Sequence, residues 1–200
     1  MTETVLLDLG NVVLGIDFRR VFRAWASSAE VPESIFYDGW ALDQAYKDHE
    51  IGKIDFHAYT QALSDRFGVN LPIDAWQSGW NDIWTEPFHS VIDLLPEVAE
   101  RYNLYAFTNT NDTHAAHWRD LFGHSLDSFD DIFVSSEIGL RKPDQQAFDY
   151  VCQCMSTPSA QVVFLDDSLE NITGAQTAGL DARHVDSEAA VVRTLRGLLE

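Results

Sequence analysis

An apolar run near the start of the chain, Thr4 to Leu7, stops abruptly at Asp8. A continuous run of Val and Leu, without alternating polar residues, is typical of a strand that is buried on both faces, as in a parallel sheet. Asp8 would then lie at the carboxyl end of this strand, which is where open α/β sheets bind their ligands. The same acid could simply cap a turn or a helix, so both interpretations stay open at this point.

Strand and helix patterns alternate regularly from about residue 87 onward. Apolar runs predict strands at residues 104–107, 132–134, 162–165 and, more weakly, 182–185, and helical patterns separate them. Residues 16–86 instead show helical patterns that are rich in aromatic side chains, without a convincing strand. We therefore predict an α/β protein with a Rossmann-like parallel-sheet core, residues 1–15 and 87–200, and an inserted all-helical cap, residues 16–86.

The charge of the chain narrows the classes of partner. Thirteen basic and 32 acidic residues among 200 give a formal net charge of −19. This charge repels phosphate backbones, so we expect no nucleic-acid partner. A small anionic substrate would need a local positive charge or a bound cation against that background. The start of the chain has no basic leader and no apolar run is long enough for a bilayer, so we expect a cytoplasmic protein without a membrane partner.

Polar side chains that suit phosphate chemistry follow three of the predicted strands, and one lysine lies in a loop between them. They are Asp8, Thr108, Asn109, Lys142, Asp166 and Asp167. Because the carboxyl ends of parallel strands share one edge of the sheet, these groups can converge. Singly, each has a plainer explanation as a helix cap or a surface charge. Together they offer a carboxylate nucleophile, groups that hold phosphate oxygens, and one cation.

The acids of this set need a positive partner. Asp166 and Asp167 directly follow a fully apolar strand, and Asp8 is expected at the same edge, so the three carboxylates would repel one another. A divalent ion removes this repulsion and supplies the charge that an anionic substrate requires. Carboxylate oxygens are the ligands that suit Mg²⁺, so the sequence favours a magnesium site.

The ordered set resembles the four motifs of the haloacid dehalogenase (HAD) superfamily. The matching segments are Asp8-Leu9-Gly10-Asn11-Val12-Val13, Thr108-Asn109, Arg141-Lys142-Pro143-Asp144 and Asp166-Asp167. The resemblance covers the whole chain, because residues 16–86 are similar to the superfamily's type 1 helical cap. The stretches DLGNVV, FTNTN, RKPD and FLDDSLENITGA look most like the bacterial α-D-glucose-1-phosphatase branch.

This resemblance implies a Mg²⁺-dependent phosphatase that hydrolyses a small phosphorylated metabolite, with a sugar phosphate such as glucose 1-phosphate favoured. It implies that Asp8 attacks phosphorus and becomes an aspartyl phosphate, and that Lys142 balances the charge of nucleophile and phosphate. Thr108 and the Asn109 amide would hold the phosphoryl oxygens.

The resemblance also implies how the metal is bound. Asp8, the Gly10 carbonyl and Asp167 would hold Mg²⁺, with Asp166 as an outer partner of this group. One position departs from the superfamily pattern, because the second residue after the nucleophile is usually an Asp that transfers protons, whereas Gly10 has no side chain. Without such a group we expect the rate to depend steeply on the pKa of the leaving group.

Two other functions stay open. A metal-independent 2-haloacid dehalogenase would use the same nucleophile on carbon, but it would not need a third carboxylate beside an anionic substrate. A non-catalytic binding or regulatory protein of the same fold would not need Asp8, Lys142 and Asp167 to be intact. Helical spacing indicates that the tryptophans of residues 16–86 are core residues first, so we assign them no role.

Overall fold

The computed structural model describes residues 2–200; Met1, the first residue of the predicted core segment, lies outside the described residues. Five strands form a parallel sheet in the order β5-β4-β1-β6-β7, with β1 in the middle. They are β1 (Thr4–Leu7), β4 (Asn103–Thr108), β5 (Asp131–Val134), β6 (Val162–Asp166) and β7 (Asp181–His184). This sheet confirms the predicted α/β class with a Rossmann-like core.

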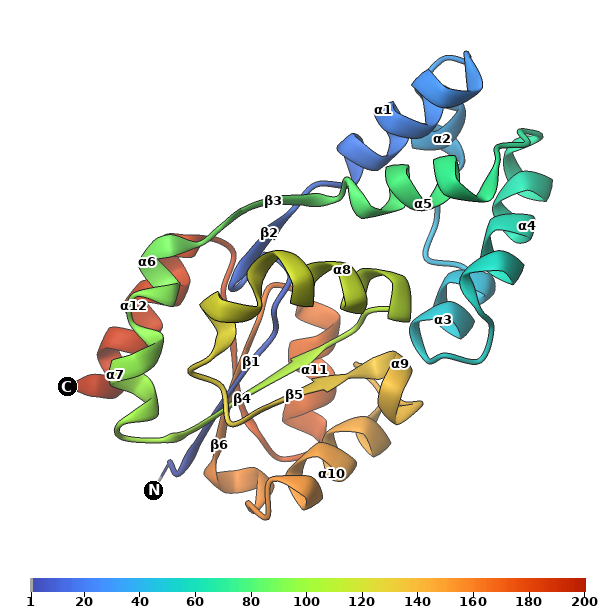
Figure 1. Ribbon diagram of the computed structural model, residues 1–200. Helices are drawn as coiled ribbons and strands as arrows, with labels where there is room; N and C mark the ends of the chain where they lie inside the picture. The colour runs from blue at the N-terminus through green and yellow to red at the C-terminus, as the bar shows by residue number, and fades with distance from the viewer. Residues whose placement is uncertain (1) are drawn as a thin grey trace.

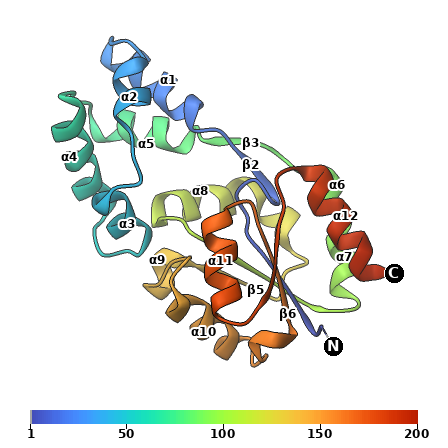
Figure 2. The same cartoon turned by 180° about the vertical axis from the view of Figure 1, so that it is seen from behind.

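Helices cover both faces of the sheet (Figures 1 and 2). Val5 and Leu7 of β1 point into one apolar cluster and Leu6 into the other, as the two-residue period of a strand requires. The first face packs against α6 (His89–Ile92), α7 (Leu95–Ala99), α8 (Asp112–Phe122) and α12 (Glu188–Leu199). The second face packs against α10 (Gln145–Cys154) and α11 (Leu169–Thr177). Three shorter elements belong to the loops that join these strands and helices: α9 (Ser135–Ile138) and two 3₁₀ turns, Gly123–Leu126 and Ser159–Gln161.

Five further helices form a separate group beyond the carboxyl ends of the strands, which we call the helical unit (Figure 1). They are α1 (Phe18–Ala29), α2 (Ser34–Gly39), α3 (Gln44–Glu50), α4 (Phe56–Phe67) and α5 (Ile73–Asn81). The unit has an apolar core of its own, in which the Trp25 ring stacks on Trp80 at 5.6 Å and meets the edge of Trp76 at 4.8 Å. Within residues 2–200, no helix has the length and apolar character needed to cross a membrane.

The chain enters and leaves the helical unit through two strands that pair with each other, β2 (Leu14–Ile16) and β3 (Trp84–Pro87). The structure therefore differs from the prediction of helix alone over residues 16–86, which fails at both ends of that range. Such short strands carry too few residues for a clear two-residue pattern. Ile83 and Trp84 also pack against the core of the unit, which prolongs the apolar pattern of α5 beyond its true end at Asn81.

Candidate active site

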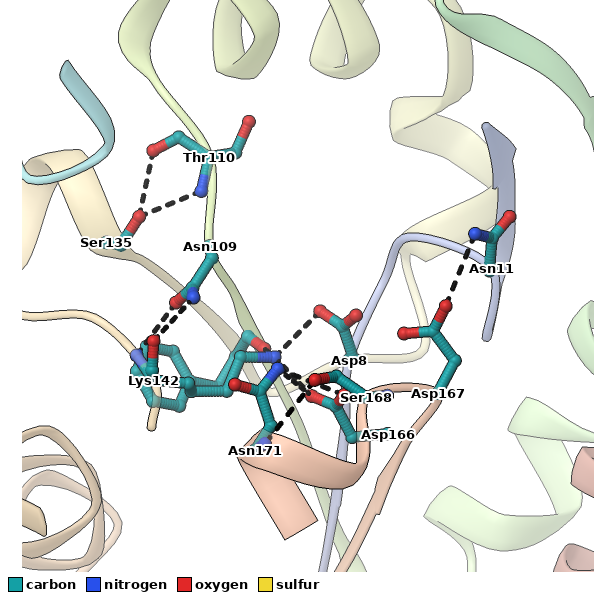
Figure 3. A network of polar contacts seen from close by, with 11 residues as sticks. Asp8, Asn11, Asn109, Thr110, Ser135, Lys142, Asp166, Asp167, Ser168 and Asn171 are labelled. Atoms are coloured by element: carbon teal, nitrogen blue, oxygen red, sulfur yellow. Dashed lines mark hydrogen bonds and ion pairs between the residues drawn. The ribbon is translucent and has the colours of Figure 1, made fainter. Parts of the chain in front are cut away.

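Three carboxylates meet at the carboxyl edge of the central strands (Figure 3). Asp8 follows β1, and its N–H donates to the Leu165 carbonyl oxygen at 2.9 Å, which continues the pairing of β1 with β6. Asp166 is the last residue of β6 and fully buried, and Asp167 follows it at the surface of the site. Ligand oxygens from the three acids lie within 4.8 Å of one another. The structure thus brings together the acids that the sequence places at this edge.

Lys142 reaches the same point from the loop that precedes α10, and its side chain is only 1% exposed. Its ammonium lies 2.9 Å from Asp8 Oδ1 and 2.7 Å from Asp166 Oδ2, and it donates to the Phe107 carbonyl oxygen at 2.7 Å. The rings of Phe107 and Phe164 flank it, each with its centroid 5.3 Å away. All three ammonium protons therefore have partners, and two of these partners are candidate site acids.

The charges at this edge do not balance. Burial, the largest cause, and the nearby Asp166 and Asp167 raise the pKa of Asp8 to about 7, against the opposing effect of Lys142. Burial and Asp166 likewise raise the pKa of Asp167. Burial disfavours the charged form of Lys142, yet Asp166 and Asp8 outweigh it and raise the pKa of this lysine. One ammonium faces three carboxylates, so the group carries excess negative charge that a further cation could neutralise.

The acids differ in how many hydrogen bonds their carboxylate oxygens accept from the protein. Asp166 accepts from Lys142, from the Ser168 N–H at 2.8 Å, and from the Asn171 side-chain amide at 3.0 and 3.1 Å. Asp167 accepts from the Asn11 side chain, at 3.3 Å. Asn171, which lies one helical turn after Asp167, therefore contacts Asp166.

Gly10 and Asn11 form the turn between β1 and β2. Asn11 has a positive φ of 56°, and its N–H donates to the Leu14 carbonyl oxygen at 2.8 Å. Gly10 does not have a positive φ, and a Cβ built on it would lie 3.3 Å from Cδ1 of Ile16, the movable end of a side chain. The backbone at Gly10 therefore does not itself demand glycine.

The segment after β4 is tied to the lysine loop. The Asn109 side chain donates to the Lys142 carbonyl oxygen at 2.8 Å and accepts from the Lys142 N–H at 2.9 Å. Its side chain is thus engaged with the backbone of that loop, which leaves the expected contact with phosphate to its backbone amide. Next to it, the Thr110 N–H donates to Ser135 Oγ at 2.8 Å (Figure 3).

A cavity of about 60 Å³ lies between this edge and the helical unit. From the core it is lined by Gly10, Thr108, Asn109, Thr110 and His114, and from the helical unit and its two linking strands by Ile16, Phe18, Tyr46, Ile83 and Trp84. Burial lowers the pKa of His114 to about 3. Its Nε2 contacts the Trp80 carbonyl oxygen at 2.9 Å and its Nδ1 the Asn111 side chain at 3.3 Å, as a neutral ring requires.

Sequence reasoning missed two residues that join the helical unit to this site, Glu50 and Ser135. Ser135 Oγ lies 2.6 Å from the Glu50 carbonyl oxygen, and Arg141 donates to the Glu50 carboxylate at 2.8 Å. A single acid at the end of a helix carries no local signal of such a partner. An ion pair between residues 91 positions apart becomes visible only in the folded chain.

Three curated proteins are similar in sequence to this chain. A D-ribitol-5-phosphate phosphatase from Bacteroides thetaiotaomicron is 21% identical over 187 residues, which cover 90% of both proteins. The sesquiterpene phosphatase astK from Aspergillus oryzae is 37% identical over 76 residues, 38% of this chain and 39% of that protein. The drimenol cyclase drtB from Aspergillus calidoustus is 50% identical over 190 residues, 90% of this chain and 33% of that protein. The chain thus matches well under half the length of the two Aspergillus proteins.

Solved structures share the fold. A HAD family enzyme from Bacteroides thetaiotaomicron, in complex with magnesium and inorganic phosphate, has a TM-score of 0.78 at 22% identity and covers 92% of this chain and 94% of its own. A predicted HAD-like hydrolase from Porphyromonas gingivalis reaches a TM-score of 0.81 at 20% identity over 98% of both chains. At such identities the likeness shows the fold alone.

A family model supplies the assignment. The relatives named above do not include an α-D-glucose-1-phosphatase, so that finer branch stays a prediction. The model described as haloacid dehalogenase-like hydrolase matches residues 2–179, which is well over half of the chain. On this match, this chain belongs to the haloacid dehalogenase-like hydrolases.

Proposed function

We propose that this hydrolase is a Mg²⁺-dependent phosphatase for small phosphomonoesters, and that residues 16–86 act as a cap over a core of residues 1–15 and 87–200. The observation that carries the proposal is the group of Asp8, Asp166, Asp167 and Lys142 at the sheet edge, in which all but Asp167 are buried. Phosphatases among the relatives support this reaction class. A metal-independent dehalogenase would have no use for the third carboxylate.

The residues at this edge fit a magnesium ion. Asp8, the Gly10 carbonyl and Asp167 would hold it, whereas Asp166 is engaged by Lys142 and Asn171 and would act from outside. When bound, Mg²⁺ draws charge from the phosphoryl oxygens and orients the phosphate. The magnesium in the similar HAD family enzyme supports this choice of ion.

The chain's own residues would then carry two displacements. A carboxylate oxygen of Asp8 forms a bond to phosphorus while the bond from phosphorus to the leaving oxygen breaks, and the leaving group takes the electron pair. Lys142 favours the ionised form of Asp8, against the effect of burial, and Thr108 and the Asn109 amide would hold the phosphoryl oxygens. Water then attacks phosphorus and loses a proton to solvent, which balances the proton that the leaving oxygen takes from solvent; the bond to Asp8 breaks and inorganic phosphate leaves.

The leaving oxygen obtains no proton from position 10, because Gly10 has no side chain. Positioned proton transfer typically contributes ~10²–10⁴-fold, so substrates with stable leaving anions gain most in its absence. Anomeric sugar phosphates and aryl phosphates fit this requirement better than primary alkyl phosphates. A sugar phosphate such as glucose 1-phosphate therefore remains the favoured substrate of the proposal.

Metal dependence tests the function. With p-nitrophenyl phosphate, we expect EDTA to abolish turnover and Mg²⁺ to restore it, and Asp167→Ala to lose metal-dependent turnover with an unchanged circular dichroism spectrum. Asp149→Ala, which removes an exposed acid of α10, is the matched control and should retain activity. Undiminished wild-type turnover in EDTA rules the proposal out, and metal-free release of chloride from 2-chloropropionate would favour the dehalogenase.

A leaving-group series tests the consequence of Gly10. We expect turnover of the native protein to fall steeply as the leaving-group pKa rises, and Gly10→Asp to reduce that slope, since an added Cβ would displace only the movable end of the Ile16 side chain. The comparison applies where chemistry limits the rate. A flat dependence in the native protein would mean that another residue supplies the proton.

A further inference from the structure

Glu50, the last residue of α3, contacts the core through its main chain and through its side chain. Its carbonyl oxygen lies 2.6 Å from Ser135 Oγ, and its carboxylate accepts from Arg141 Nε at 2.8 Å. The Glu50 side chain is 5% exposed and that of Arg141 is 16% exposed. One residue of the helical unit thus makes two polar contacts with the core, one buried and one partly buried.

These contacts lead to the two loops that carry the expected phosphate-binding groups. Ser135 also accepts from the Thr110 N–H at 2.8 Å, so it joins Glu50 to the segment after β4. Arg141 directly precedes Lys142 in the other loop. The Asn109 side chain links the two loops through the Lys142 backbone, as Figure 3 shows. Glu50 is therefore connected to the segment after β4 through Ser135, and to the Lys142 loop through Arg141.

The chain after Glu50 fits closely against the core. Gly52 has a positive φ of 67°, and a Cβ built on it would lie 2.6 Å from the Ser136 carbonyl oxygen. No side chain fits in that space, so backbone meets backbone at this point. The contact at Glu50 is thus part of a close-packed junction.

A buried ion pair is a poor source of stability, because both charges lose their hydration, and removal of one partner leaves the other charge unpaired. Here the helical unit can relieve such a charge by moving away from the core and admitting water. We propose that Glu50 is a positioning residue, which couples closure of the helical unit to the placement of Lys142 and of the segment Thr108 to Thr110. The kinetic part of this proposal rests on the proposed phosphatase function.

Distances between spin labels test closure without any turnover. Labels on the exposed Cys154 of α10 and on Ser27→Cys of α1 report the separation of core and helical unit by double electron–electron resonance. With Mg²⁺ and beryllium fluoride present, we expect Glu50→Gln to lower the closed population at least about tenfold, since Arg141 is left unpaired. The amide keeps the size of the side chain and leaves the main-chain contact with Ser135 in place.

Asp82→Asn is the matched control. It converts a carboxylate that pairs with Arg20, also at 2.8 Å, but both partners lie within or next to the helical unit and are about half exposed. We expect its distance distribution to equal that of the wild type. In Glu50→Gln/Arg141→Gln no unpaired charge remains, so the distribution should return toward the wild type.

Kinetics supply the second readout. Because small misplacements of catalytic groups can cost up to about 100-fold, we expect Glu50→Gln to lower kcat of p-nitrophenyl phosphate hydrolysis by ~10–100-fold, with a smaller change in KM. Equal distances and equal kcat in Glu50→Gln and Asp82→Asn would overturn the proposal. If the wild type hydrolyses no phosphomonoester, the proposed function fails, while the distances still decide whether Glu50 controls closure.

Discussion

The carboxyl edge of the sheet and the interior of the helical unit are both buried, but different interactions hold them together. At the sheet edge, Lys142 joins Asp8 and Asp166, and the two buried carboxylates depend on this one positive charge. In the helical unit, rings such as Trp25 and Trp80 pack face to face, and each contributes largely through the area it buries. A substitution at the edge should therefore disturb its neighbours electrostatically, whereas one in the helical unit should leave a local cavity.

The largest effect is expected at Asp8. Asp8→Asn should reduce turnover of p-nitrophenyl phosphate by about 10⁴-fold or more, because an amide cannot serve as the nucleophile. The same change removes one buried carboxylate from a group with excess negative charge, so the free energy of unfolding in urea should stay equal or rise. Beryllium fluoride should form an adduct with the native protein only. Retained turnover would instead indicate direct attack by water.

Lys142→Met removes the one positive charge that pairs with Asp8 and Asp166. Two buried carboxylates then lose their shared partner, so we expect the free energy of unfolding to fall by about 3–5 kcal/mol, measured by urea denaturation. Lys53→Met is the control, because Lys53 pairs with Asp48 at 2.9 Å with its own side chain 62% exposed, and it should cost less than about 1 kcal/mol. Equal losses in the two variants would show that the charges at the edge act independently.

Trp25→Ala tests the other side of the comparison. The Trp25 side chain is fully buried, and its Nε1 donates to the Trp76 carbonyl oxygen at 2.9 Å. Its loss should lower the free energy of unfolding by about 3–4 kcal/mol through the cavity it leaves. At low temperature, activity per folded molecule should change much less than in Lys142→Met. An equally deep loss of activity would mean that the interior of the helical unit also sets the chemistry.

Near neutral pH the smallest expected effect is a dependence of stability on pH at His114, which lies between the two regions. Its pKa is about 3 in the folded protein and near 6.5 unfolded, so only the unfolded chain takes up a proton as the pH falls below about 6.5. The stability that this neutral ring contributes is thus present above pH 6.5 and lost toward pH 3. Below pH 6, the wild type should lose about 1.4 kcal/mol per pH unit more than His114→Gln in urea titrations. Parallel curves would contradict the buried neutral ring.

The sheet and the charge group could be predicted because local patterns encode them. A run such as Val162 to Leu165 has few structures open to it, and an acid directly after such a run must lie at the sheet edge. Asp8 and Asp166 are thereby placed by strand boundaries alone. The roles assigned to them come from the resemblance and stay predictions.

Other features of the fold and the site could not be predicted, because they depend on contacts between segments that are distant in the sequence. Glu50 lies at the end of a seven-residue helix, and nothing near it indicates a partner 91 residues away. Asn109 is at the expected place, but its side chain turns toward the Lys142 backbone because that loop passes beside it. Strands β2 and β3 are too short for a periodic signal and gain their hydrogen bonds only from each other.

The pairing of β2 with β3 also bears on how this architecture can vary. Leu14 lies opposite Pro87 and Ile16 opposite Trp84, so the polypeptide leaves and re-enters the sheet-bearing part at neighbouring positions. An insertion whose two ends are adjacent can be lengthened, shortened or exchanged without altering any strand of the parallel sheet. Exchange of the helical unit at β2 and β3 would therefore yield proteins that keep the same charged edge and differ in the surface that faces it.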